Sequence, residues 1–114
     1  MIYDGGVRGG RISLDRFVDL VATAPARMMG LYPKKGTIAV GSDADLVIFD
    51  SDATLTLSAE THHMRMDYNL YEGREVTGVP TTVLMRGEPV LVYRQFVGKA
   101  GGGQFLKRSL YQSL

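Results

Sequence analysis

An apolar run at Leu46–Phe49 gives the first predicted element of the chain. The four residues follow a polar turn, and Asp50 ends the run. A segment this short and this rich in branched side chains favours a strand buried on both faces over a helix. Gly36 and Gly41 precede it, where glycine is typical of turns. We therefore expect the sheet of this protein to begin at Leu46.

Three later segments continue the strand pattern. Residues 54–57 alternate polar and apolar side chains, which is the period of a half-buried strand. Residues 81–86 and 89–93 are apolar and flank Gly87-Glu88, which predicts a hairpin. Pro89 cannot donate a backbone hydrogen bond, so it should lie at a strand start or on an edge. The sequence predicts a sheet of at least four strands.

Before the sheet, apolar residues recur with helical spacing. Ser13 is a suitable N-cap, because its hydroxyl can accept a backbone N–H of the first turn. Leu14, Phe17, Val18 and Val21 follow at i, i+3, i+4 and i+7, which places them on one stripe. The pattern predicts an amphipathic helix of about ten residues whose apolar stripe needs a partner.

A second, shorter helix is expected at Pro25–Met29. Proline suits the first turn of a helix, and Gly30 is a typical stop. Thr23 should share the capping role with Ala24, which is a weak cap. Residues 13–31 are therefore predicted to be helical, with their methionines serving as core filling.

Glycine marks both ends of the chain. Four of the first ten residues are glycine, so residues 1–12 are predicted to be a connector without strong helix or strand preference. Residues 98–114 contain three consecutive glycines at 101–103, which should be mobile, and apolar residues return beyond them. We expect residues 98–114 to be an arm that packs on another subunit. A short terminal helix on the same chain is the alternative.

The composition is typical of a globular domain. Of the 114 residues, 45% are hydrophobic and 22% are charged, and the formal net charge is +1. A chain of this size can bury a hydrophobic core without stabilisation by disulfide bonds or metal ions. The lack of cysteine excludes a disulfide framework and a thiolate metal site, and it fits a reducing cytosol. Because no apolar run approaches the roughly 20 residues that span a bilayer, we expect a cytoplasmic protein without a membrane partner.

Two polar features resemble ligand-binding sites, but a simpler explanation is preferred for each. Lys34 and Lys35 are adjacent, but a nucleic-acid surface would be more basic than a net charge of +1 allows, so we interpret residues 33–36 as a solvated turn. Glu60, His62 and His63 could ligate a metal. Adjacent histidines, however, point in different directions on a strand or a helix, and the i, i+4 spacing of a zinc-binding helix is absent. The residues predict no catalytic, substrate-binding or metal site in this chain.

Residues 64–78 are predicted to form a long polar loop that carries Tyr68 and Tyr71. Long loops are often functional, and surface tyrosines are frequent interface anchors. The two rings could equally cover the end of the sheet, and both interpretations remain open at this point.

Several sequence blocks resemble a known family. The segment 36–50 is similar to the Gly-x-Ile-x-x-Gly and Ala-Asp-Leu-Val pattern of the small sheet domain in metal-dependent amidohydrolases. A closer resemblance, to dihydropyrimidinases and hydantoinases, rests on residues 11–14, 58–64, 67–73, 96–99 and 105–108. It implies an α+β fold in which a small β-sheet or β-sandwich accessory domain (residues 32–97) follows helices that pack on a catalytic barrel.

The resemblance also implies an activity for the parent enzyme. Such enzymes hydrolyse the ring amide of dihydropyrimidines or hydantoins with two zinc ions, held by barrel histidines, an aspartate and a carboxylated lysine. A complete barrel needs roughly 250 residues, whereas this chain has 114. We therefore expect the C-terminal portion of such an enzyme, with no cofactor of its own, which supports and oligomerises but does not catalyse.

The alternative is a free-standing, non-catalytic interaction module derived from the same accessory domain. In either case the partners should be the barrel of a parent enzyme or further copies of the chain in a homo-oligomer. The candidate interface residues come from the first helix, the polar loop and the tail: Leu14, Phe17, Val18, Tyr68, Tyr71, Phe105, Leu106 and Tyr111.

Overall fold

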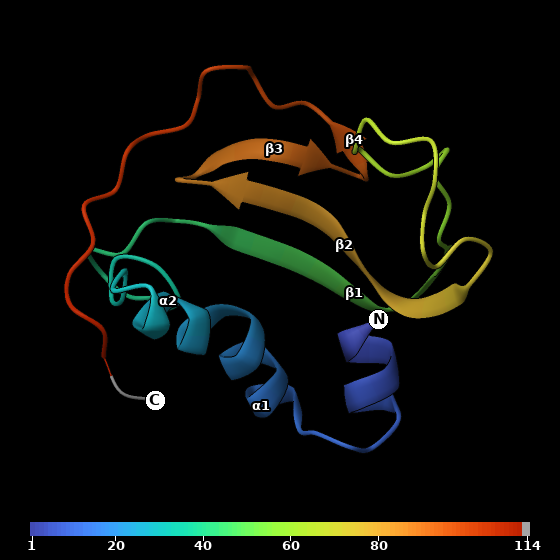
Figure 1. Ribbon diagram of the computed structural model, residues 1–114, viewed down its shortest axis with the longest axis horizontal. Helices are drawn as coiled ribbons and strands as arrows, with labels where there is room; N and C mark the ends of the chain where they lie inside the picture. The colour runs from blue at the N-terminus through green and yellow to red at the C-terminus, as the bar shows by residue number, and fades with distance from the viewer. Residues whose placement is uncertain (113–114) are drawn as a thin grey trace.

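The computed structural model describes residues 1–112 and contains two layers, one helical and one a four-stranded sheet (Figure 1). This arrangement confirms the α+β class. The elements in chain order are η1 (Tyr3–Arg8), α1 (Leu14–Val18), η2 (Asp19–Thr23), α2 (Ala24–Met28), β1 (Leu46–Thr56), β2 (Glu75–Met85), β3 (Glu88–Val92) and β4 (Gln95–Phe96).

The elements α1, η2 and α2 form one continuous helical segment, residues 14–28. Its start is as predicted, because the Arg16 N–H donates to Ser13 Oγ at 3.2 Å. The second helix predicted at Pro25–Met29 is present as α2, but it is continuous with α1, because the chain stays helical through the π-turn η2 just before the proline. Pro25 has no N–H to give to the preceding turn, and a wider turn accommodates that loss. Thr23 does not cap a helix and instead donates its hydroxyl to Gly36 O at 2.7 Å.

The glycine-rich start is helical, which corrects the predicted connector without regular structure. Residues Tyr3–Arg8 form the π-helix η1. Asp4 Oδ1 accepts the Thr77 N–H of β2 at 3.2 Å, so this short helix is fixed to the sheet. Contacts with a distant strand override the weak local preference of glycine.

The strand β1 is longer than the pattern predicted. It continues through Asp50 to Thr56 and therefore absorbs the separate strand expected at 54–57. Asp50 Oδ1 accepts the N–H groups of Asp52 and Ala53 at 3.0 Å each, within an irregularity of the β1–β2 pairing. A bulge stabilised by a side chain lets polar residues interrupt a strand without ending it.

The remaining strands form an antiparallel sheet in the order β1-β2-β3-β4. The predicted hairpin is present, with its two-residue turn at Arg86-Gly87, where both φ angles are positive. This is one residue earlier than expected, and Glu88 already belongs to β3, with Pro89 second in that strand. The number of strands agrees with the prediction, but the fourth is the short β4, and β2 begins within the expected polar loop.

The tail has no helix between residues 98 and 112. It leaves β4, runs around the outside of the sheet and reaches α2 on the same chain (Figure 1). The terminal helix considered from the sequence is therefore not formed within the described residues.

The chain buries very little apolar surface. Within residues 1–112 the buried hydrophobic residues are Ala24, Ala26, Val76 and Val79, and no large side chain is fully buried. The accessible area is 8531 Å², whereas a monomeric protein of 12.5 kDa exposes about 6,200 Å². The radius of gyration, 15.5 Å, likewise exceeds the roughly 13 Å of a compact domain of this length. The expectation of a self-sufficient core is wrong.

Candidate functional site

Three aromatic rings link the helical layer to the sheet. The ring centroid of Tyr3 lies 5.7 Å from that of Phe17 on α1 and 4.7 Å from that of Phe49 on β1, both in edge-on geometry. Tyr3 also lies against Gly78 of β2, where an added Cβ would come within 2.3 Å of the tyrosine ring. Gly78 has φ +94° as well, so both backbone conformation and space require glycine here.

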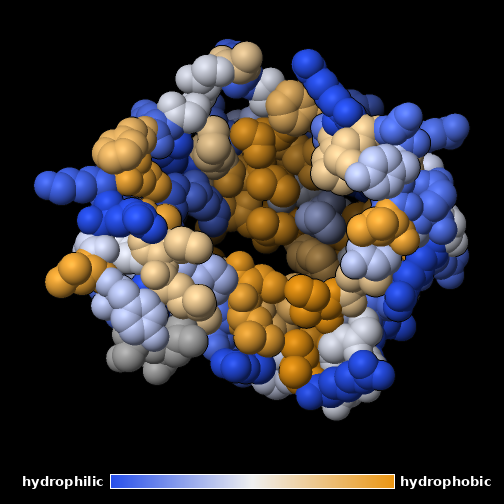
Figure 2. Space-filling view, in the orientation of Figure 1, coloured by the Kyte–Doolittle hydropathy of each residue, from blue (hydrophilic) through white to orange (hydrophobic). Residues whose placement is uncertain are grey.

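Away from these rings, the two layers leave an opening lined by apolar side chains (Figure 2). No Cα atom of the helical segment lies within 8 Å of a strand Cα. Val47 and Ile48 of β1 are exposed, which corrects the prediction that Leu46–Phe49 is buried on both faces. Adjacent strand residues point to opposite faces of the sheet, so Val47, which alternates with the Tyr3 partner Phe49, faces the helical layer and Ile48 does not. We call the exposed apolar residues of the helical segment, together with Val47, the open apolar face: Leu14, Val18, Leu20, Val21, Met28 and Val47.

The candidate interface residues fall into three separate groups. Leu14 and Val18 are exposed on α1, while Phe17 is half-buried against Tyr3. Tyr68 and Tyr71 are exposed in the loop that joins β1 to β2. In the tail, Phe105 and Tyr111 are exposed and Leu106 is half-buried. The fold therefore brings only the first group into the open apolar face.

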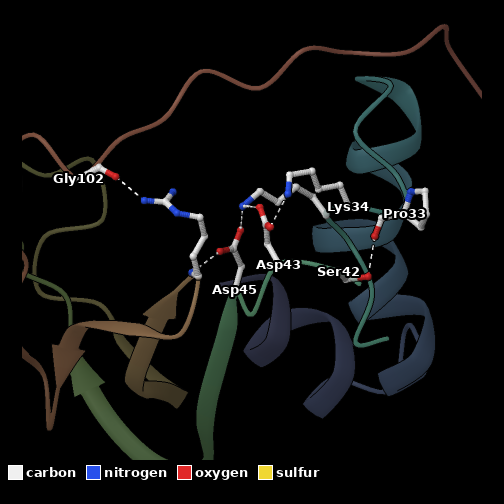
Figure 3. Close-up of polar contacts among 8 residues, drawn as sticks. Pro33, Lys34, Ser42, Asp43, Asp45 and Gly102 are labelled. Atoms are coloured by element: carbon white, nitrogen blue, oxygen red, sulfur yellow. Dashed lines mark hydrogen bonds and ion pairs between the residues drawn. The ribbon is translucent and has the colours of Figure 1, made fainter. Parts of the chain in front are cut away.

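A cluster of charged residues holds the loop before β1 to the β2–β3 turn (Figure 3). Lys34 Nζ donates to Asp43 Oδ1 at 2.7 Å, and Lys35 Nζ forms an ion pair with Asp43 Oδ2 at 2.8 Å. Lys35 also pairs with Asp45, whose other oxygen accepts the Arg86 N–H at 2.8 Å. The predicted turn is present and the side chain of Lys34 is 55% exposed, but that of Lys35 is only 18% exposed, so Lys35 is not a solvated turn residue.

The cluster shifts the ionisation of its members. The pKa of Asp43 falls from 3.8 to about 2, first because of the hydrogen bond from Lys34 and then because of that from Lys35. Burial raises the pKa of Asp45, but hydrogen bonds from Lys35 and the Arg86 N–H outweigh burial and lower it overall. Burial likewise lowers the pKa of Lys35, and its bonds to Asp43 and Asp45 reverse that effect. All three groups are therefore held in their charged forms.

The histidines are not arranged as metal ligands. His62 Nδ1 accepts the Met64 N–H at 3.0 Å, and its Nε2 is buried without a hydrogen-bond partner. His63 lies in the loop between β1 and β2, and its ring centroid is 6.2 Å from that of Phe96 on β4. His62 lines a cavity of about 240 Å³ whose walls include Leu55, Val79 and Leu91. Across residues 1–112, no three His, Cys, Asp or Glu side chains lie close enough to hold a metal ion.

The sequence analysis missed two structural carboxylates. Glu72 accepts the Ala59 N–H at 2.7 Å and closes the loop, and a hydrogen bond from Ser58 is the first cause of its lowered pKa. Asp45 ties β1 to the Arg86 turn. The ion pairs of Asp43 and Asp45 could have been predicted from the sequence, because these two acidic residues follow two lysines across a turn that contains two glycines. Glu72 has no such signal.

A family model described as "Amidohydrolase family" matches residues 6–90. The chain belongs to the amidohydrolase family. It is 57% identical over its full length to the D-hydantoinase of Geobacillus stearothermophilus and 45% identical over 95% of its length to the dihydropyrimidinase of Rattus norvegicus. These matches cover 24% and 21% of the two relatives, so the chain spans about a quarter of their length or less.

Solved amidohydrolase structures agree with this match. A D-hydantoinase crystal structure superposes with a TM-score of 0.94 at 58% identity, covering 98% of this chain and 24% of that one. The dihydropyrimidinase from Brevibacillus agri gives a TM-score of 0.95 at 50% identity, with 24% of its chain covered. The open apolar face thus belongs to a fold that, in these relatives, is part of a polypeptide about four times as long. Among residues 1–112, no helix is both long and apolar enough to span a membrane.

Proposed function

We propose that this chain is the C-terminal portion of a cyclic amidohydrolase that hydrolyses the ring amide of hydantoins or dihydropyrimidines. The support is the match to D-hydantoinases and dihydropyrimidinases over almost the whole chain. In this proposal the chain contributes support and assembly, and the catalytic groups lie in the remaining polypeptide.

The observation that carries the structural role is the excess of exposed surface. The chain exposes about 2,300 Å² more than a compact monomer of its mass, and the extended tail accounts for part of this. Areas of this size are typical of obligate interfaces. This exposed surface includes the open apolar face, and apolar burial provides the main driving force for such association. We assign the open apolar face to the catalytic barrel.

The proposed reaction implies two zinc ions, and the described residues do not fit them. His62 already uses Nδ1 to accept a backbone N–H, and among residues 1–112 no three His, Cys, Asp or Glu side chains lie close enough to hold a metal ion. We therefore assign the zinc ligands to the remaining polypeptide and derive no catalytic step from residues of this chain.

The test is complementation. The chain is mixed or co-expressed with the Geobacillus stearothermophilus D-hydantoinase shortened by the segment that this chain matches. With zinc supplied, ring opening of hydantoin or dihydrouracil is expected from the mixture and from neither part alone. Turnover by the purified chain alone would contradict the non-catalytic role. A chain that fails to associate would instead favour the free-standing interaction module.

A matched pair of valines locates the interface. Val18 on the open apolar face is 49% exposed, and Val97 beyond β4 is 47% exposed. Val18→Asp should abolish co-purification and activity of the mixture, because a charge placed in an apolar interface is strongly unfavourable. Val97→Asp should leave both unchanged. Equal effects of the two substitutions would contradict the assignment of the open apolar face to the barrel.

A further inference from the structure

The C-terminal tail returns to the end of the helical segment and makes sequence-specific contacts there. The Ser109 N–H and the Ser109 hydroxyl both donate to Gly30 O, at 2.8 and 3.0 Å. The Gln112 N–H donates to Arg27 O and its side-chain amide to Tyr32 O, each at 3.3 Å. The tail thus supplies hydrogen-bond donors to carbonyl groups at the end of the helical segment, where the supply of intrahelical donors ends.

The acceptor site is shaped to admit an extended backbone. Gly30 ends the helical segment with φ +66°, a conformation that favours glycine. A Cβ on Gly30 would lie 2.1 Å from Ser109 O and 2.8 Å from Ser109 C. These atoms belong to the backbone and cannot turn aside as a flexible side chain could. Gly30 is therefore required both for the turn and for the approach of the tail.

A second contact lies near the start of the tail. The Arg86 guanidinium, on the β2–β3 turn, donates to Gly102 O in the glycine tract (Figure 3). The Arg86 backbone N–H is itself bound to Asp45. The tail is consequently held at the sheet by Gly102 and at the helical segment by Ser109. The two layers also meet at η1, through the Tyr3 ring and the Asp4–Thr77 hydrogen bond.

From this geometry we propose that residues 102–112 are an intramolecular strap. The end of the helical segment, residues 27–32, is a docking site for an extended peptide, and the chain's own residues 109–112 occupy it. The strap fixes the helical layer relative to the sheet. It depends on contacts within this chain alone, so it stands or fails independently of the proposed function.

Hydrogen exchange of the Ser109 and Gln112 amides tests the strap in the full 114-residue chain. Both N–H groups donate in the docked tail and should be protected, to the same degree at different protein concentrations. Gly30→Ala should raise the exchange rate of both amides at least about tenfold, because its Cβ displaces the tail. Ser109→Ala, which keeps the backbone donor and removes only the hydroxyl, should raise it by a few-fold.

A second glycine separates loss of docking from backbone strain. Gly10 has φ +68°, close to that of Gly30, and an added Cβ would have nothing within 4 Å. Gly10→Ala should leave the exchange of the Ser109 and Gln112 amides unchanged. Unprotected amides in the unmodified chain, or equal effects of Gly30→Ala and Gly10→Ala, would overturn the strap. Protection that falls on dilution would assign the docking to a second copy and would contradict an intramolecular strap.

Discussion

The charged cluster before β1 and the open apolar face are two surfaces of the same chain, completed in different ways. Lys34, Lys35, Asp43 and Asp45 find their partners within about ten residues of sequence and on the adjacent turn. The apolar residues of the helical segment and β1 remain exposed across an opening. Polar contacts can be satisfied locally, whereas apolar surface needs a large complementary area. Under the proposed function, this difference marks the open apolar face as the part of the fold that another polypeptide completes.

The largest effect on the chain itself should come from breaking the aromatic link across the opening. Tyr3→Ala removes both edge-on contacts, with Phe17 and with Phe49. We expect a loss of about 3 kcal/mol in the free energy of unfolding. Urea denaturation at one fixed protein concentration measures it. Tyr93→Ala is the control, because Tyr93 is 85% exposed, and its effect should stay below about 0.5 kcal/mol.

A smaller loss is expected where Tyr3 meets the sheet. Gly78→Ala places a Cβ 2.3 Å from the Tyr3 ring at φ +94°. The cost should be about 2 kcal/mol, part from the backbone and part from the clash. Gly41→Ala has a similar φ of +91° and nothing within 4 Å, so thermal unfolding should report only the backbone part, about 1 kcal/mol. Equal shifts for both variants would mean that Tyr3 does not pack against β2 in solution.

The charged cluster should make stability depend on pH. The pKa of Asp43 is depressed in the folded chain to about 2, below the value of about 4 expected when unfolded. Its stabilising contribution is therefore complete above about pH 4 and is lost as the pH falls from about 4 to about 2. Asp43→Asn should flatten this part of the profile, measured by the urea midpoint at each pH. Asp52→Asn, at an exposed position, should retain the wild-type slope; identical slopes in both variants would contradict the role of Asp43.

The smallest effect is expected for an isolated ion pair. Arg16 and Asp19 are 2.6 Å apart on the surface of the helical segment, with side chains 58% and 36% exposed. Asp19→Ala should change the free energy of unfolding by about 0.3 kcal/mol, because water and salt screen such pairs. Added salt should abolish even this difference. A loss above about 1 kcal/mol would mean that this pair behaves like the cluster around Asp43.

Local signals in the sequence predicted local structure well. The Ser13 cap, the stop at Gly30 and the hairpin around Gly87 each depend on residues a few positions apart. The sequence could not give the extent of β1 or the start of β2, since these depend on pairing between strands about thirty residues apart. Asp50 and its neighbours suggested a strand end, and only the bulge opposite β2 explains why the strand continues.

The site was harder to predict than the fold because its contacts join residues that are far apart in the sequence. The helical stripe of Leu14 and Val18 is visible in the sequence, and its need for a partner followed from it. The docking of Ser109 on Gly30 joins residues 79 positions apart and has no local signature. The family resemblance supplied what spacing could not, namely that this chain corresponds to only about a quarter of its relatives.

Light scattering combined with binding of a dye specific for apolar surface tests the central claim most directly. The claim is that the open apolar face is an interface that this chain cannot cover alone. The isolated chain should have the mass of a dimer or larger assembly and bind the dye. Adding the shortened D-hydantoinase should move the chain into a mixed complex and reduce dye binding. A monodisperse species of 12.5 kDa that binds no dye would contradict the claim.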